Sequence, residues 1–302
     1  MRIAVTGSSG LIGSSLRFAL EGRGHQVTRI VRPQSRGVRG QVVVWDPPRG
    51  MLEAAGLEGH DVVIHLAGEN IAGLWTRRKK AALRESRIVG TRLLSETLAR
   101  LRRPPRALLS ASAAGYYGNR PAGVVVDEDS PPGTGFLAEL AVEWERATEA
   151  AASAGIRVVC MRFGLVLSRK GGVLAPMLPL FRLGLGARLG TGEQAWSWIA
   201  LAEIAPAVWH VLEHATLTGP INFVAPRAVT QAEFVRTLAH VLRRPAFVSL
   251  PEWLLRPVLG EMADELFLNG VRVAPRRLAE SGYRFRYPDL EPALRALLGA
   301  SS

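Results

Sequence analysis

The sequence has a single cysteine, Cys160, among its 302 residues. One thiol excludes an internal disulfide framework and is typical of a protein kept in a reducing compartment. No segment reaches the roughly 20 apolar residues that a membrane-spanning helix needs. The first residues, 1–7, lead directly into an expected strand, without the charged region followed by a long apolar one that a signal peptide has. We therefore expect a cytoplasmic protein without a membrane partner.

Lysine is almost as scarce as cysteine, so arginine supplies nearly all of the positive charge behind the formal net charge of +12. Surfaces that bind nucleic acids combine clustered basic residues with interleaved aromatic ones. The arginines of this chain are spread along its length, and the densest basic group is 77–80. The sequence therefore predicts a solvated basic surface and no nucleic-acid partner.

Short apolar segments alternate with helical patterns through the first two thirds of the chain. Val62–Ala67 is apolar apart from His65, as in a strand that is buried on both faces. The other expected strands are Ile3–Val5, Val27–Val31, Val42–Trp45, Ala107–Leu109 and Ile156–Met161, and the expected helices are Leu11–Leu20, Arg77–Leu101 and Phe136–Ala154. This alternation predicts an α/β fold with a doubly wound parallel sheet, the Rossmann arrangement.

A glycine-rich motif, Thr6–Gly13, lies between the first strand and the first helix. Gly7 permits the tight turn, Gly10 lets the backbone approach a pyrophosphate, and Gly13 lets the helix pack close to the strand. The amides at the start of the helix can then bind phosphate. We predict a dinucleotide site formed by Gly7, Ser9, Gly10, Leu11, Ile12 and Gly13.

The residue after the second strand discriminates between the two nicotinamide dinucleotides. NAD sites usually place Asp or Glu there to bind the ribose 2′-hydroxyl, whereas this chain has Arg32, with Arg36 nearby and no acid. A guanidinium can bind a 2′-phosphate with two parallel hydrogen bonds, which a carboxylate would repel. The sequence favours NADP(H) as cofactor; the alternative is a surface arginine in an arginine-rich chain.

Several segments together resemble one known family. The glycine motif, Asp61–Gly68, Ser110–Ser112 and Tyr116–Gly118 resemble an extended short-chain dehydrogenase/reductase. More narrowly, His65–Ile71, Arg87–Arg92 and Trp196–Ile199 resemble its atypical "epimerase family" branch, related to NAD-dependent epimerases and dehydratases, and 248–298 resembles the C-terminal domain of unassigned function in that branch. The similarity covers essentially the whole chain.

This resemblance implies how the chain is organised. Residues 1–170 form an NADP(H)-binding Rossmann domain, completed by parts of 195–225, and 171–302 form a smaller, mixed lobe that covers the substrate. The helices 77–101 and 136–154 are those that extended relatives use to form homodimers, while the sequence itself leaves the oligomeric state open. The further cofactor residues implied by the resemblance are Leu66, Ala67 and Gly68 under the adenosine, Arg87 and Arg92 at the phosphates, and Gly164 and Val166 beside the nicotinamide.

The family's catalytic pattern is incomplete in this chain. Its chemistry uses a serine, a tyrosine that transfers a proton, and a lysine that lowers the pKa of the tyrosine. Ser112 fits the serine, but Phe136 and Leu140 stand at the positions of the tyrosine and the lysine. Tyr116 and Tyr117 are substitute phenols or, as we favour, aromatic walls beside the cofactor.

The leading hypothesis is therefore an oxidoreductase with a small-molecule substrate. A non-catalytic redox sensor or scaffold is the alternative, and a sugar-nucleotide epimerase is disfavoured because epimerisation relies on the missing tyrosine. Trp196 and Trp198 follow a glycine-rich stretch, which suggests an aromatic pocket for a carbonyl compound; core packing is the other interpretation. His210–His214 matches an H-x-x-E-H zinc pattern, but no third ligand is evident, so we expect no metal.

Overall fold

The computed structural model describes residues 1–35 and 40–299, and Arg36 lies outside this part of the chain. The described residues group into two compact units that alternate along the sequence. The first unit comprises 1–112, 140–161 and 215–221, and the second comprises 113–139, 162–214 and 222–302. These units reflect packing density within the chain, so the functional boundary that we place at residue 170 stays a prediction.

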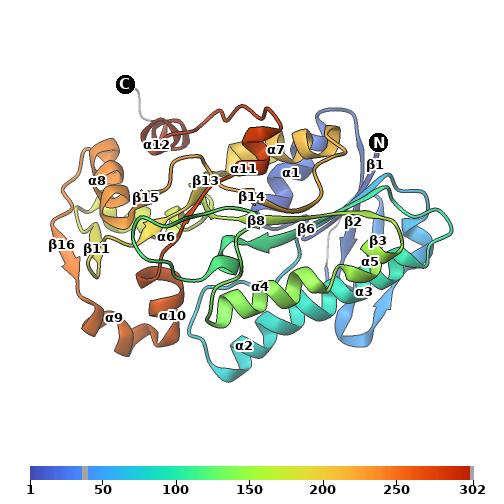
Figure 1. The fold of residues 1–302 in the computed structure, drawn as a ribbon, viewed down its shortest axis with the longest axis horizontal. Coiled ribbons are helices and arrows are strands. Elements are labelled where there is room, and N and C mark those ends of the chain that lie inside the picture. The colour runs from blue at the N-terminus through green and yellow to red at the C-terminus, as the bar shows by residue number, and fades with distance from the viewer. Residues whose placement is uncertain (36–39, 300–302) are drawn as a thin grey trace. The chain divides into compact units, whose positions relative to one another are not determined.

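An eight-stranded sheet dominates the first unit, in the order β14-β8-β6-β5-β1-β2-β3-β4 (Figure 1). Its strands are β1 (Arg2–Thr6), β2 (Gln26–Val31), β3 (Val42–Asp46), β4 (Met51–Leu52), β5 (Val62–His65), β6 (Ala107–Ala113), β8 (Arg157–Phe163) and β14 (Gly219–Phe223). The last residues of β8 and β14 count with the second unit. β1 pairs in parallel with β2 and β5, and β5 with β6, which confirms the predicted Rossmann sheet.

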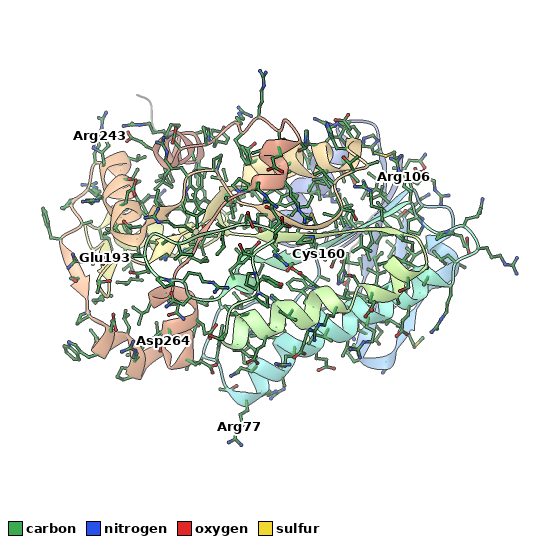
Figure 2. The ribbon with its side chains drawn as sticks, viewed as in Figure 1. Arg77, Arg106, Cys160, Glu193, Arg243 and Asp264 are labelled. Atoms are coloured by element: carbon green, nitrogen blue, oxygen red, sulfur yellow. The ribbon has the colours of Figure 1, made fainter. Side chains whose placement is uncertain are left out.

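Apolar residues explain why these strands lie at the centre of the unit. All four residues of β5 are buried, as expected of a strand covered on both faces. Ala4, Val63 and Leu108 pack in one core with Leu94 of the neighbouring helical layer. Cys160 belongs to the same core and is labelled on β8 in Figure 2. β4 is the exception to the parallel order, because it pairs antiparallel with β3.

The helices of this unit are α1 (Leu11–Glu21), α2 (Arg77–Arg84), α3 (Gly90–Ala99) and α5 (Glu149–Ser153), and α4 (Phe136–Arg146) enters it at residue 140. The expected helix 77–101 contains a π-helical turn, Glu85–Val89, between α2 and α3. Such turns are rare and often lie at functional sites. The predicted helix 136–154 is likewise divided, into α4 and α5. Arg77 points away from the ribbon at the start of α2 (Figure 2).

The second unit is built from short elements. Its strands are β7 (Val125–Val126), β9 (Leu165–Ser168), β10 (Gly171–Gly172), β11 (Ala187–Leu189), β12 (Ala195–Trp196), β13 (Trp198–Ala200), β15 (Val229–Thr230), β16 (Val248–Leu250) and β17 (Arg272–Val273). Its helices are α6 (Leu174–Arg182), α7 (Leu201–Glu213), α8 (Gln231–Leu242), α9 (Glu252–Leu259), α10 (Glu261–Ala263), α11 (Arg276–Glu280) and α12 (Leu290–Leu298). Among the described helices, none is long and apolar enough to cross a membrane.

Candidate functional site

The glycine loop of the first unit can pack closely against its neighbouring segments only because its glycines lack side chains. Gly7 has a φ of 62°, and a Cβ there would lie 2.7 Å from the carbonyl carbon of Leu66. A Cβ on Gly13 would lie 2.1 Å from the Gly7 oxygen. Gly10 begins α1 without a side-chain cap, and the first turn of this helix contains no acid. Its first amides are therefore suited to binding an anion.

A second loop adjoins the glycine loop through one threonine. The amides of Leu66 and Ala67 donate to Thr6 Oγ1 at 2.9 and 3.1 Å. Thr6 Oγ1 also lies 2.8 Å from Nδ1 of His65, the last residue of β5. The ends of β1 and β5 are thus joined by side-chain as well as by backbone hydrogen bonds. Of the residues predicted at this edge, Leu66 and Ala67 are half-buried and Gly68 is exposed.

Arg87 packs against the second loop. Arg87 itself lies in the π turn. Its guanidinium carbon would be 3.5 Å from a Cβ added to Gly68. The guanidinium also lies 5.1 Å from the ring centre of Trp144, and burial lowers the pKa of Arg87. Arg92, one turn further along, is exposed on α3.

Positive charge gathers around Glu69 in the same unit. Lys79 donates to Glu69 at 2.7 Å, and this hydrogen bond, with the charges of Lys79, Arg32 and Arg87, holds the pKa of the carboxyl below its usual range. Arg32 is exposed directly after β2. Arg29, inside β2, donates from Nε to Ser8 Oγ at 3.0 Å. The sequence analysis did not identify Arg29 or Lys79 as site residues. For Arg29, a charged residue within an otherwise apolar strand was a usable signal.

The predicted catalytic serine lies inside β6. Ser112 is 3% exposed, and its hydroxyl donates to Glu145 Oε1 at 2.6 Å. Its short distance is typical of a charge-assisted hydrogen bond. Phe136 and Leu140, at the family's tyrosine and lysine positions, are 7% and 3% exposed. Neither side chain can transfer a proton or carry a charge.

The two tyrosines of the second unit have different environments. Tyr117 is fully buried; its hydroxyl donates to Asn222 Oδ1 at 2.8 Å and accepts from Arg162 Nη1 at 2.9 Å. Burial raises the pKa of Tyr117 to about 12, although Arg162 acts in the opposite direction. Tyr116 is half-buried, and the Arg162 guanidinium carbon lies 3.4 Å from its ring centre. Tyr117 is therefore a packed structural group, and Tyr116 is the more accessible phenol.

The aromatic lining expected from Trp196 and Trp198 is wrong. Trp196 is 3% exposed and packs 5.1 Å from the ring of Phe234, while Trp198 is fully buried and donates from Nε1 to the Arg227 oxygen at 3.0 Å. Both indoles belong to the core of the second unit, because large aromatic side chains bury more apolar surface there than at a pocket mouth.

The predicted nicotinamide segment lies beside this core. A Cβ on Gly164 would lie 2.5 Å from the Ser197 oxygen. The backbone at Gly164 can therefore lie this close to Ser197 only because residue 164 has no side chain. Val166 is half-buried and pairs with Ile199 between β9 and β13.

The C-terminal segment 264–277 holds the Tyr117 region in place within the second unit. The carboxylate of Glu265 accepts from the Phe136 and Leu137 amides, at 3.1 and 3.2 Å, and so caps the start of α4. β17 pairs with β7, and Glu128 Oε1 accepts from the amides of Asn222 and Arg277. Burial raises the pKa of Glu128.

The zinc-like pattern is occupied by other contacts. His210 Nε2 lies 2.8 Å from Ser281 Oγ, and its ring stacks on that of His214 at 3.8 Å. Within residues 1–35 and 40–299, no three His, Cys, Asp or Glu side chains are arranged to hold a metal ion.

Comparison with known protein families identifies the family of the chain. A model of the NAD dependent epimerase/dehydratase family matches residues 3–224. The chain belongs to this family. A second model, of the domain of unknown function DUF1731, matches residues 250–297 and confirms the C-terminal domain expected from the sequence.

Individual family members resemble the chain over nearly its whole length. Epimerase family protein Mb2239 of Mycobacterium bovis is 43% identical over 97% of this chain and 96% of its own. Human epimerase family protein SDR39U1 is 36% identical over 99% of this chain and 100% of its own. A crystal structure of human SDR39U1 (isoform2) with NADPH superimposes with a TM-score of 0.89, at 34% identity, over 99% of both chains.

Proposed function

We propose that this chain binds NADP(H) and acts as an oxidoreductase on a small carbonyl compound. The observation that carries the proposal is the charge pattern after β2: Arg32 stands where an acid would select NAD, and Arg87 and Lys79 add positive charge around Glu69. A 2′-phosphate carries about two negative charges, which favours this environment over that of an acid-bearing site.

The glycine loop fits the rest of such a dinucleotide. Gly7 and Gly13 let β1, the loop at Leu66 and α1 approach more closely than Cβ atoms would allow, and the uncapped start of α1 offers its amides to a pyrophosphate. In this proposal the loop binds the pyrophosphate together with Ser9, Leu11 and Ile12. Human SDR39U1, whose crystal structure is described with NADPH, supports the same cofactor for its relative.

NADPH, when bound, would supply a hydride to a carbonyl carbon. The chain's own residues would orient the carbonyl, and the resulting alkoxide would take its proton from water, because Phe136 at the family's proton-donor position has none to give. Ser112 is our candidate for orienting the substrate oxygen: its hydroxyl hydrogen, which is donated to Glu145 here, would turn to the carbonyl oxygen. Gly164 and Val166 are proposed to border the nicotinamide, and Arg92 to contribute to phosphate binding. The single buried cysteine suits a reducing compartment such as the cytoplasm.

A second candidate function, a non-catalytic NADP(H)-dependent sensor, is favoured by Phe136 and Leu140. Both are buried at positions where the family's chemistry needs a proton donor and a cation. The two candidates differ in one measurement: an oxidoreductase consumes NADPH when a panel of carbonyl compounds is added, and a sensor binds it without turnover. A sugar-nucleotide epimerase is disfavoured by the same two residues.

The cofactor is tested by titrating the purified protein with NADPH and NADH. We expect NADPH to bind at least about tenfold more tightly, equivalent to ~1.4 kcal/mol. Arg32→Asp should reverse this preference, and Arg23→Asp, at an exposed site in the turn after α1, serves as the charge-matched control. Equal affinities of the two dinucleotides for the wild-type protein would overturn the NADP(H) assignment.

A further inference from the structure

One buried imidazole joins four segments of the first unit. His65 and Thr91 are fully buried, and so is Thr6 at the end of β1. His65 Nδ1 lies 2.8 Å from Thr6 Oγ1, and Nε2 lies 2.9 Å from Thr91 Oγ1 on α3. Trp144 of α4 donates from Nε1 to the same Thr91 oxygen at 2.9 Å. Burial lowers the pKa of His65 to about 4, so the ring is neutral at physiological pH.

The hydrogen bonds define which nitrogen of His65 carries the proton. Thr6 Oγ1 accepts from the Leu66 and Ala67 amides, which occupy its two lone pairs. Its single hydrogen is therefore left for His65 Nδ1. The proton of the neutral ring then resides on Nε2, which donates to Thr91. No other neutral side chain accepts at one position and donates at another across a rigid ring in this way.

This chain of hydrogen bonds ends beside the candidate phosphate-binding arginine. The hydrogen bond that Trp144 donates to Thr91 fixes the indole, and the guanidinium of Arg87 lies 5.1 Å from the centre of that indole. On its other side Arg87 packs against Gly68, in the loop whose first amides are bound by Thr6. The imidazole thus controls both surfaces between which the guanidinium is held.

We propose that His65 is a positioning residue that holds Arg87 in place, through Thr91 and Trp144, for binding a cofactor phosphate. This inference rests on the proposed NADP(H) function. It goes beyond that function by assigning the cofactor affinity in part to a group that need not touch the cofactor. A fixed guanidinium loses less rotational freedom when it binds an anion than a mobile one does.

The test measures NADPH affinity by fluorescence titration in a double-mutant cycle. His65→Phe and Arg87→Gln should each weaken NADPH binding about tenfold, and the double variant should also lose about tenfold rather than a hundredfold, because both changes remove the same contribution. Additive losses would overturn the proposal. If wild-type protein does not bind NADPH at all, the proposed function fails, which is a different outcome from additive losses.

Two further variants separate positioning from general loss of structure. His65→Gln can still offer an N–H near the Nε2 position, toward Thr91, whereas His65→Asn can replace only the Nδ1 acceptor. We therefore expect Gln to restore more NADPH affinity than Asn, and the reverse order would overturn the assignment to Arg87.

His60→Phe is the matched control, since His60 is 3% exposed and bonds only Thr28 and Leu57 among its described contacts. This control should lower thermal stability and leave NADPH affinity unchanged. If it weakened NADPH binding as much as His65→Phe does, the affinity loss in His65→Phe would be explained by general destabilisation and the positioning role would be overturned.

Discussion

Two of the buried polar networks, one in each unit, differ in charge. In the first unit Thr6, His65, Thr91 and Trp144 are all neutral at pH 7 and are joined in one continuous chain of hydrogen bonds. In the second unit Arg162 bonds Tyr117, Tyr117 bonds Asn222, and the backbone of Asn222 bonds Glu128. The second network thus contains a guanidinium and a carboxyl group in the interior.

The difference teaches what each network is suited for. A neutral network costs little to bury and holds its groups rigidly, which suits loops that must keep a shape for a ligand. Glu128 has one carboxylate oxygen, Oε2, without a hydrogen-bond partner among the described atoms. Burying such an oxygen costs stability when the carboxyl is ionised. We therefore expect the first network to affect ligand binding, and the second to affect mainly the stability of the fold.

The largest predicted effect separates the networks by pH. His65 has a lowered pKa of about 4 in the folded protein against 6.5 ordinarily, so its contribution to stability is present above pH 6.5 and lost as pH falls toward 4. Relative to His65→Gln, the wild-type free energy of unfolding should fall by up to ~3 kcal/mol over this interval. Urea unfolding at several pH values measures it.

Glu128 should show the opposite sign in the same experiment. Its pKa is raised, so its contribution is fully present below the ordinary carboxyl range and is lost as pH rises through the folded value. Relative to Glu128→Gln, the wild-type protein should lose stability as pH rises above about 4.5. If the difference in free energy of unfolding between wild type and variant changed with pH in the same direction for His65→Gln and Glu128→Gln, the two networks would not differ as proposed.

Tyr117→Phe tests whether the second network is structural. The change leaves the Arg162 guanidinium and the Asn222 carbonyl oxygen without the phenol, so the free energy of unfolding should fall by ~1–3 kcal/mol. NADPH affinity should stay the same, measured on the same preparation. Tyr116→Phe is the matched control, because its hydroxyl is in a half-buried ring and should matter less to stability. A weaker NADPH affinity in Tyr117→Phe alone would assign this tyrosine to the binding site.

A smaller effect is expected at the start of α4. Glu265→Ala removes the carboxylate that accepts from the Phe136 and Leu137 amides, and loss of such a cap costs about 1 kcal/mol. Hydrogen exchange of these two amides should accelerate. The surface acid Glu252 provides the control, since it forms an exposed ion pair with Arg256 and Glu252→Ala should leave α4 unchanged. Unchanged exchange in Glu265→Ala would remove Glu265 as the cap.

The smallest effect is expected at the zinc-like pair. His210→Ala loses a partly buried contact with Ser281 and should change stability by less than about 1 kcal/mol. NADPH affinity should not change, and elemental analysis of the purified protein should give no stoichiometric zinc. One zinc ion per chain that disappears in this variant would contradict the expectation.

How far the sequence predicted the molecule depends on whether a feature is local. Strands such as β5 were predictable because a mainly apolar run is typical of a strand buried on both faces. The glycine loop was predictable because its glycines have the spacing of a dinucleotide motif between a strand and a helix. The π turn Glu85–Val89 was not, because no residue type in this segment marks a local change from α-helical to π-helical hydrogen bonding. Arg87 was nevertheless identified, through the resemblance to the family.

The second network lay beyond sequence reasoning for a physical reason. Tyr117, Glu128, Arg162 and Asn222 come from four separated segments, and their hydrogen bonds exist only after the chain has folded. Trp196 and Trp198 illustrate the same limit. An indole suits a pocket mouth as well as a core. Only the folded structure, in which β12 pairs with β15 and β13 with β9, shows that both indoles are interior.

Cys160 has a practical consequence that follows from its place on β8. It is the single thiol of the chain, and it is 6% exposed inside the core that lies against the central sheet. A thiol reagent can reach it only when this part of the sheet opens, so the rate of labelling reports the opening equilibrium. The wild-type protein therefore carries an internal probe of its own unfolding. Saturating NADPH should slow the labelling by the factor by which NADPH binds the closed form more tightly than the opened form.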